Sequence, residues 1–252
     1  MTPSPVASPV PGLPELPARR RLYLMRHGSV DYFTADGTPL PPHTVPLNAT
    51  GQAQADAAGA LLGAAGARFD RVLTSGLRRT VETAQRVLAA AGQAEPPGGL
   101  CTDERLQEIR PGRLEDLPRA QLKDAFTAVF SATADIESQR FLGGETIGQM
   151  LDRSLPAFDE LLADPAWRCA LVVLHGGINR GLLGHVMTGQ RLMLGRLEQS
   201  PACINVLDVG APGHTVVRAV NLAPTQWLHE RERYTTMEKL LLQYLRGGDV
   251  PL

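Results

Sequence analysis

The feature that most constrains the fold of this chain is a succession of short apolar runs, each followed by a longer stretch with helix signals. The run 168–174 (RCALVVL) is the most strand-like, and the runs 21–26 (RLYLMR) and 70–75 (DRVLTS) have the same character. Further strands are expected at 202–209 and 215–221, and helices at 48–65, 77–91, 145–162, 177–187 and 236–245, with a weaker helical signal over 115–133. This order predicts an α/β fold, a three-layer sandwich in which helices flank a mainly parallel sheet.

Proline separates the first residues from the rest of the chain. Residues 1–18 hold prolines at positions 3, 5, 9, 11, 14 and 17, and proline at that density blocks both helices and sheet ladders. We therefore expect an extended tail over residues 1–18, a plain leader or else a segment that docks to a partner. Residues 19–252 are enough for one sizeable core, and we expect one domain there.

Charge and cysteine usage exclude several classes of partner. The 25 basic and 26 acidic side chains leave a formal net charge of −1, so we expect neither nucleic acid nor a membrane as partner. The three cysteines (Cys101, Cys169 and Cys203) are far apart and odd in number, which fits neither a metal site nor a disulfide framework. The start has no secretory signal and the apolar runs are too short to cross a bilayer, so we expect a cytoplasmic protein. The sequence leaves the oligomeric state open.

Reactive residues follow three of the expected strands. Arg26-His27-Gly28 ends the first, Thr74-Ser75 ends the second, and His175-Gly176-Gly177 follows the strongest apolar run. In open α/β sheets, ligands bind beyond the carboxyl ends of the strands. We expect these residues to meet at one edge of the sheet, although they are far apart in sequence.

The first of these groups offers a nucleophile together with a site for an oxyanion. Neutral imidazole is a competent nucleophile near neutral pH, and His27 at a strand end can present one ring nitrogen outward. Arg26 would neutralise a bound oxyanion, and Gly28 would let the backbone approach it. Taken alone, an Arg-His-Gly tripeptide is a weak signal, and a core or capping histidine is the alternative interpretation.

Three further residues complete the candidate site. Arg79 lies near an expected helix N-terminus, where free backbone N–H groups attract anions, whereas Arg78 is interpreted as a solvated helix charge. His175 can donate a hydrogen bond to a phosphoryl oxygen, and a structural histidine is the equal alternative. Glu108, held near an apolar wall, can keep its proton and act as a general acid, although most glutamates lie on the surface.

Together these residues resemble the histidine phosphatase superfamily, which includes the cofactor-dependent phosphoglycerate mutases. The similarity runs from about residue 20 to residue 221, with the motifs in the family's order. Arg26-His27-Gly28 resembles the phosphohistidine signature, and Ser75–Ala84 resembles the segment Ser-x-Leu-x-Arg-x-x-x-Thr-Ala. Four other segments resemble the corresponding segments of the family. They are Leu47–Gly51, with Asn48 in place of the family's threonine, the segment that contains Glu108 and Gly112, the segment Gly143–Thr146, and the pair His175-Gly176.

The resemblance implies a phosphohistidine mechanism in residues 19–252, without metal or other cofactor. It assigns catalysis to His27, Glu108 and His175, and phosphate binding to Arg26, Arg79 and Gly176. The nucleophilic histidine attacks phosphorus, the glutamic acid protonates the leaving oxygen, and water then cleaves the phosphohistidine. Glu145 and Asp31 are the alternative acids.

Departures from the family pattern bear on the reaction. Many members read Arg-His-Gly-Glu-Thr or Arg-His-Gly-Glu-Ser, whereas Ser29-Val30 follows Gly28 here, and Asp31-Tyr32 stands where mutases usually read Trp-Asn. After Gly112, Glu115-Asp116 is closer to the phosphatase form than to the mutase form. We therefore expect a phosphomonoester hydrolase that acts on a small phosphorylated metabolite. A phosphoglycerate-type mutase and a non-catalytic member that binds phospho-ligands are the alternatives.

Overall fold

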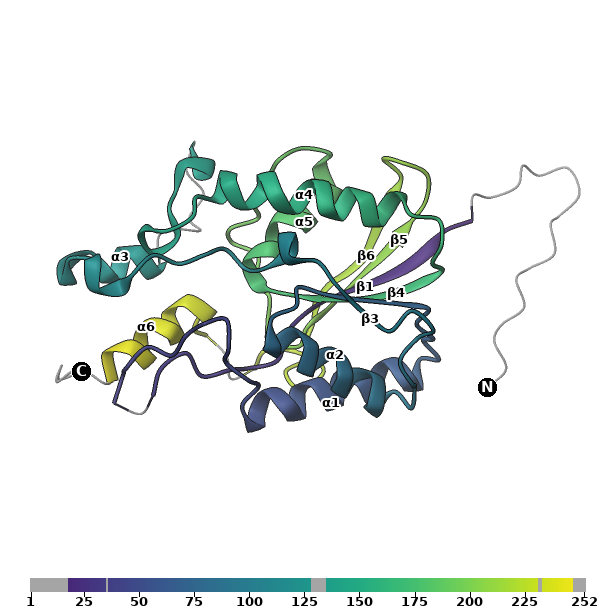
Figure 1. Ribbon diagram of the computed structural model, residues 1–252, viewed down its shortest axis with the longest axis horizontal. Helices are drawn as coiled ribbons and strands as arrows, with labels where there is room; N and C mark the ends of the chain where they lie inside the picture. Colours follow the sequence, from purple (N-terminus) through teal and green to yellow (C-terminus); the bar gives the residue numbers. More distant parts are fainter. Residues whose placement is uncertain (1–17, 35, 128–134, 231–232, 247–252) are drawn as a thin grey trace, which may run out of the picture.

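A six-stranded sheet between layers of helices organises the computed structural model, which describes residues 18–34, 36–127, 135–230 and 233–246 (Figure 1). The strands are β1 (Arg20–Arg26), β2 (Arg71–Thr74), β3 (Leu100–Thr102), β4 (Cys169–Leu174), β5 (Ile204–Val209) and β6 (Thr215–Leu222). Their order is β3-β2-β4-β1-β5-β6; the first four pair in parallel, and β5 and β6 join by antiparallel pairing. The expected α/β fold with a mainly parallel sheet is confirmed. All of the proline-rich tail except Ala18 lies outside the described residues.

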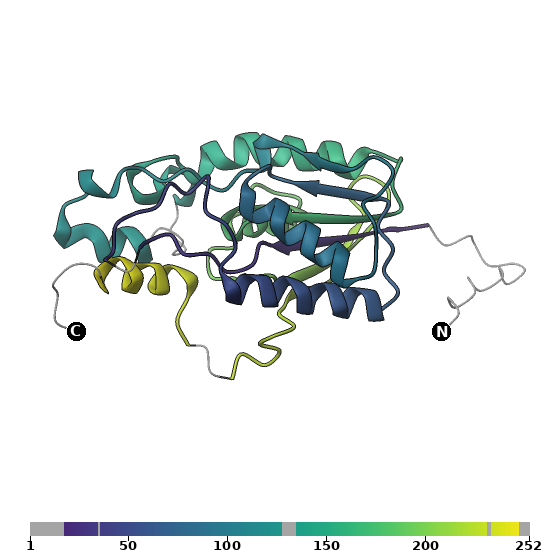
Figure 2. The same ribbon diagram turned by 60° about the horizontal axis from the view of Figure 1, so that its bottom comes forward.

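Two pairs of helices cover the two faces of the sheet. Helices α1 (Ala49–Ala64) and α2 (Arg78–Ala90) pack together on one face, and α4 (Ile147–Ala163) and α5 (Gly176–Thr188) pack together on the other (Figures 1 and 2). Successive side chains of a strand point to opposite faces. Leu22 and Leu24 of β1 therefore join the core beneath α4 and α5, whereas Met25 joins the core beneath α1 and α2.

Side-chain caps fix where the helices begin. Asn48 accepts a hydrogen bond from the Gly51 backbone N–H at 2.8 Å, so it caps α1 as the threonine of the family motif would. Thr146 and Gln149 form a reciprocal capping box at the start of α4. The helix expected from residue 145 therefore begins at Ile147.

The region between β3 and α4 differs most from the sequence-based expectation. Single 3₁₀ turns lie at Glu104–Leu106, Leu114–Asp116, Arg119–Gln121, Ile136–Ser138 and Phe141–Gly143, and only Leu122–Thr127 forms an α-helix, α3. The weak helical signal over 115–133 thus yields one short helix, while residues 128–134 lie outside the described part. Helix α6 (Thr236–Arg246) packs beside α3, at the end of the sheet where the parallel strands finish (Figures 1 and 2).

No helix within the described residues is long and apolar enough to cross a membrane.

Candidate active site

The reactive residues that follow β1, β2 and β4 lie together at the carboxyl edge of the sheet. The ring centroids of His27 and His175 are 5.2 Å apart, and Ser75 Oγ is 2.8 Å from His175 Nε2. The register explains this proximity, because Arg26 pairs with Leu174 and the next residue of each strand is a histidine. The order of strands and helices was therefore sufficient to bring together residues that are about 100 positions apart.

His27 is held as a neutral ring with one nitrogen unprotonated. Its Nδ1 is 2.7 Å from the Gly28 carbonyl oxygen, which can only accept, so Nδ1 carries the proton and Nε2 keeps its lone pair. The side chain is 2% exposed. Burial, together with the nearby charges of Arg79 and Arg26, holds the pKa of His27 well below its usual value of 6.5. The ring therefore has the protonation state that a nucleophile needs.

The loop that carries His27 is hydrogen-bonded to both helices on its side of the sheet, α1 and α2. The Gly28 N–H donates to Thr83 Oγ1 of α2 at 3.1 Å, and the Ser29 N–H donates to Gln54 Oε1 of α1 at 2.9 Å. A Cβ on Gly28 would lie 2.4 Å from the Gly51 carbonyl oxygen, and a Cβ on Gly51 would lie 2.1 Å from the Ser29 carbonyl oxygen. The two glycines thus permit a backbone-to-backbone contact that fixes the loop.

His175 is fully buried and has one ring nitrogen engaged. Ser75 Oγ contacts its Nε2, while Thr80 Oγ1, on the other side of Ser75, donates its own proton to the Leu77 carbonyl. Burial, then Arg79, His27 and Arg26, hold the pKa of His175 well below 6.5, so this ring is neutral as well. When Ser75 turns its single proton from Thr80 to Nε2, the proton of the neutral ring lies on Nδ1. That nitrogen can then donate to a ligand.

Two arginines flank the histidines. Arg26 donates to the Gln199 carbonyl and, at 2.8 Å, to Thr236 Oγ1, while Arg79, the second residue of α2, donates to the Pro42 carbonyl. Both guanidiniums are buried, with 7% of Arg26 and 2% of Arg79 exposed. By contrast, Arg78 pairs with Glu82 and is largely exposed, as the sequence indicated.

Three buried N–H groups around His27 have no protein partner. Within the described part of the chain, Arg26 Nε, Arg79 Nε and His175 Nδ1 lack a hydrogen bond. An unsatisfied buried polar group is costly and calls for an explanation. The charges of Arg26 and Arg79 act on both histidines, and the His175 ring lies 5.2 Å from the His27 ring. A bound oxyanion would satisfy them together. Gly176 adjoins this cluster, since a Cβ on it would lie 3.5 Å from Arg26 Nε.

Glu108 is positioned by backbone donors, which the sequence did not indicate. Its Oε2 accepts from the Gly177 N–H at 2.9 Å, and its Oε1 accepts from the N–H groups of Ile178 at 3.1 Å and Ile109 at 3.0 Å. A Cβ on Gly177 would lie 2.6 Å from Oε1, so glycine is needed there for the carboxyl group to approach. Glu108 therefore lies at the N-terminus of α5, directly after His175.

The two alternative acids are engaged elsewhere. Glu145 forms an ion pair with Arg153 at 2.8 Å, and although burial opposes it, Arg153 lowers the pKa of this carboxyl group. Asp31 accepts a hydrogen bond from Asn48 Nδ2 at 3.0 Å. Neither residue lines the cavity that contains His27.

That cavity has a volume of about 540 Å³ and contains most of the residues singled out in the sequence. His27, Arg26, Arg79, Glu108 and Gly176 line it, and His175 lies behind them. The lining residues that the sequence gave no reason to select include Tyr32, Arg180 and Thr236. Thr236 is 210 residues from Arg26, whose guanidinium it contacts, and no local pattern in the sequence signals such a pairing.

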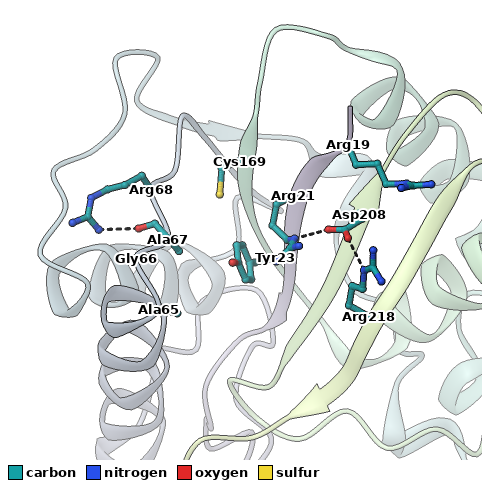
Figure 3. A pocket seen from close by; sticks show the side chains of 10 residues that line it. All are labelled: Arg19, Arg21, Tyr23, Ala65, Gly66, Ala67, Arg68, Cys169, Asp208 and Arg218. Carbon is teal, nitrogen blue, oxygen red and sulfur yellow. Dashed lines mark hydrogen bonds and ion pairs between the residues drawn. The ribbon is translucent and has the colours of Figure 1, made fainter. Parts of the chain in front are cut away.

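A second hollow, of about 490 Å³, lies at the amino ends of β1 and β4 (Figure 3). In it Arg21 and Arg218 converge on Asp208, whose pKa they lower although burial opposes the shift. Arg68 donates to the Ala67 carbonyl at 2.9 Å. The carboxylate of Asp208 is therefore paired with two arginines at this edge of the sheet. At the carboxyl edge, by contrast, nitrogens of Arg26, Arg79 and His175 have no protein partner among the described residues.

A family model described as the histidine phosphatase superfamily (branch 1) matches residues 22–222. The chain belongs to this superfamily. Among curated relatives, the 2,3-bisphosphoglycerate-dependent phosphoglycerate mutase of Azorhizobium caulinodans is 32% identical over 206 residues, which cover 77% of this chain and 90% of that protein. The mutase of the same description from Xanthobacter autotrophicus is 29% identical over 202 residues, which cover 77% and 89%.

The solved structures that resemble this chain include phosphatases. A mycobacterial glucosyl-3-phosphoglycerate phosphatase in complex with VO3 has a TM-score of 0.62 and 25% identity, covering 80% of this chain and 99% of that one. A putative alpha-ribazole-5′-P phosphatase from Escherichia coli has a TM-score of 0.64 at 24% identity, covering 80% and 96%, and supports the fold. The relatives in sequence are thus mutases, and these structural neighbours are phosphatases.

Proposed function

We propose that this histidine phosphatase hydrolyses phosphomonoesters of small metabolites through a phosphohistidine on His27, without metal or other cofactor. The observation that carries the proposal is the set of three unpartnered buried donors around a histidine that is kept neutral. A phosphoryl group would satisfy the donors, and it would place phosphorus beside the unprotonated Nε2. His175, Arg26, Arg79 and Gly176 would surround its oxygens.

The reaction proceeds in two displacements. His27 Nε2 forms a bond to phosphorus as the bond from phosphorus to the ester oxygen breaks, and protonated Glu108 gives its proton to that oxygen. Glu108, now a carboxylate, takes a proton from water, whose oxygen attacks the phosphohistidine. The bond between phosphorus and nitrogen breaks, inorganic phosphate leaves, and His27 returns to its neutral form. The two guanidiniums offset the charge that develops on the phosphoryl oxygens.

Two features of the chain and one neighbour favour hydrolysis over mutase activity. Asp31-Tyr32 and Glu115-Asp116 depart from the mutase pattern, and a solved neighbour at 25% identity is described as a phosphatase. The mutase alternative draws support from the curated relatives, which reach 32% identity. A direct comparison decides between them: a hydrolase releases inorganic phosphate from 3-phosphoglycerate or other esters. A mutase interconverts 2- and 3-phosphoglycerate with little net release.

The His27→Ala variant tests the nucleophile. Turnover of p-nitrophenyl phosphate should fall on the order of a thousandfold or more, because the covalent step is lost, and no acid-labile phosphoenzyme should form. The matched control is His185→Gln on α5, a histidine that pairs with Asp159 outside the cavity and should leave turnover unchanged. Residual activity above about a tenth, with an unchanged melting curve, would exclude His27 as the covalent centre. Wild-type activity that EDTA abolishes and magnesium or zinc restores would refute the metal-independent mechanism.

A further inference from the structure

The cavity above His27 combines a polar floor with apolar walls. The phosphate donors lie at the floor, whereas many wall residues are apolar and come from segments far apart in sequence. Among them are Phe33, Leu40, Phe126, Phe141, Met237 and Leu240. Figures 1 and 2 show why these segments meet: the loop after β1, α3 and α6 gather at the same end of the molecule.

The apolar side chains of the walls are packed against other side chains of the protein. Tyr244 of α6 contacts Phe33 at 5.5 Å between ring centroids and Phe126 at 6.3 Å, so one side chain links all three segments. Phe126 is 1% exposed and Met237 is 9% exposed, and both belong to the core that continues under α4 and α5. The walls are therefore present before a ligand arrives, which reduces the entropy cost of binding.

Charged groups in the walls are mostly neutralised by other protein groups. Arg113 pairs with Glu115 at 2.6 Å, and Arg180 pairs with Glu198 at 3.5 Å. Arg110 and His43, the other ionisable residues of the wall, are exposed to solvent. Burying a carboxylate without a partner is strongly unfavourable, so the apolar part of the walls disfavours a leaving group with its own negative charge.

We propose that the alcohol portion of the substrate is predominantly apolar, an extended alkyl, alicyclic or aromatic group that fills this cavity above the phosphate. This inference rests on the proposed function, because the phosphate subsite sets the depth at which the alcohol lies. A volume of about 540 Å³ falls within the range of pockets that enclose a whole small organic ligand. Selectivity then comes from the removal of apolar surface from water, and phosphoglycerates are poor substrates.

A chain-length series tests the proposal without relying on turnover. Methyl-, butyl- and hexylphosphonate cannot be hydrolysed, and their dissociation constants can be measured by calorimetry. Each buried methylene should tighten binding about three- to fourfold until the cavity is full. In parallel, kcat/KM for ethyl, butyl and hexyl phosphate should rise in the same order and exceed that for glycerol 3-phosphate, whose leaving group is also an alkoxide.

A pair of variants locates the effect in the cavity. Leu40→Gln places a polar group in the wall and should weaken hexylphosphonate binding about tenfold, while methylphosphonate binding changes less than twofold. The matched control, Leu61→Gln, changes an exposed leucine of α1 outside the cavity and should leave the whole series unchanged. Should Leu40→Gln fail to fold, Leu240→Ala serves the same purpose on α6.

The outcomes separate this inference from the proposed function. Affinity that is flat along the phosphonate series, or 3-phosphoglycerate hydrolysed faster than hexyl phosphate, overturns the apolar substrate class even when phosphohistidine forms. Affinity that rises with chain length, in a protein that hydrolyses no ester, supports the apolar cavity and overturns the hydrolase. Rising affinity together with rising kcat/KM supports both.

Discussion

At His27, the same arginines that would attract a phosphoryl group also keep the histidine uncharged. Burial disfavours the imidazolium form most, and Arg79 and Arg26 add to its effect. An exposed histidine would be partly protonated in mildly acidic solution and would lose its nucleophilic nitrogen. Burial of His27 and His175 therefore favours catalysis, but it carries a cost in stability at low pH.

This cost predicts a dependence of stability on pH. Both histidines titrate near 6.5 when unfolded and well below 6.5 when folded, so below pH 6.5 the unfolded chain binds more protons. The free energy of unfolding should therefore fall as the pH falls from about 6.5 toward the folded values, by at most about 1.4 kcal/mol per pH unit for each histidine. Urea titrations between about pH 7 and pH 5 measure this slope.

Two variants attribute the slope to the buried rings. His175→Gln should show a smaller loss of stability between about pH 7 and pH 5 than the wild type, because one of the two titrating groups is gone. His214→Gln, in the exposed turn between β5 and β6, should keep the wild-type slope. The same slope in all three proteins would show that the buried histidines do not govern acid stability.

Glu108→Gln tests the general acid. In single turnover, phosphorylation of the enzyme by alkyl phosphates should slow by roughly a hundredfold, because an alkoxide leaving group needs a proton. Transfer from p-nitrophenyl phosphate should slow much less, since that leaving group is a weak base. Water attack also loses its base, so an acid-labile phosphoenzyme should accumulate.

Asp31→Asn is the matched control for this measurement, and it should transfer phosphate from both kinds of ester at the wild-type rate. If Glu108→Gln slows both esters equally and no phosphoenzyme accumulates, the acid is a different residue. The hydrogen bonds of Glu108 to Gly177 and Ile178 would then serve only to hold the start of α5.

The sequence was sufficient to predict that the histidines and arginines lie together, because each lies at the end of a recognisable strand or at the start of a recognisable helix. It described the surroundings of Glu108 poorly, since the backbone groups that hold this side chain come from α5, about 70 residues later. Thr236 was missed for the same reason. Local patterns reveal which element a residue belongs to, whereas its partners depend on how distant elements pack.

Among the elements, the contact between α1 and the loop after β1 leaves little room for change. Gly51→Ala should gain up to about 1 kcal/mol from helix propensity, but the new Cβ would lie 2.1 Å from the Ser29 carbonyl oxygen. Backbone must move to relieve that contact, so we expect a net loss of about 3 kcal/mol. The displaced loop carries His27, and turnover should fall at least about tenfold.

The control for this glycine is Gly98→Ala, at a position where a Cβ has nothing within 4 Å. It should leave both the melting temperature and turnover unchanged. A Gly51→Ala protein that keeps wild-type turnover and stability would mean that α1 and the His27 loop can separate without consequence.

The elements with a clear apolar pattern, including the four-residue β2, were predicted within a few residues, whereas β3 and the 3₁₀ turns were not. β4 was expected over 168–174 and occupies Cys169–Leu174, because a continuous apolar run fits a strand buried on both faces. β3 has three residues at the sheet edge, paired with β2 alone, and a segment that short carries no periodicity. The 3₁₀ turns around α3 are held by tertiary packing, which local propensity does not reveal.

At the scale of the whole molecule, the phosphate subsite and the wall above it come from different parts of the chain. The subsite is built at the ends of β1, β2 and β4, whereas the wall includes Phe126 of α3 and Met237 and Leu240 of α6. The hydrogen bond from Arg26 to Thr236 joins the two parts. Substitutions in α3 or α6 can therefore change which alcohol is accepted while the chemistry at phosphorus stays the same.

The central position of β1 also has a consequence for synthesis on the ribosome. This strand pairs with β4 on one edge and β5 on the other, so the first edge remains open until residue 174 and the second until residue 209 has been translated. At about 5–20 residues per second, the 183 residues between Arg26 and Val209 take roughly 10–40 s. An apolar strand with an open edge readily pairs with other chains. We therefore expect the nascent segment 20–26 to be a target for chaperones that shield extended apolar segments during that interval.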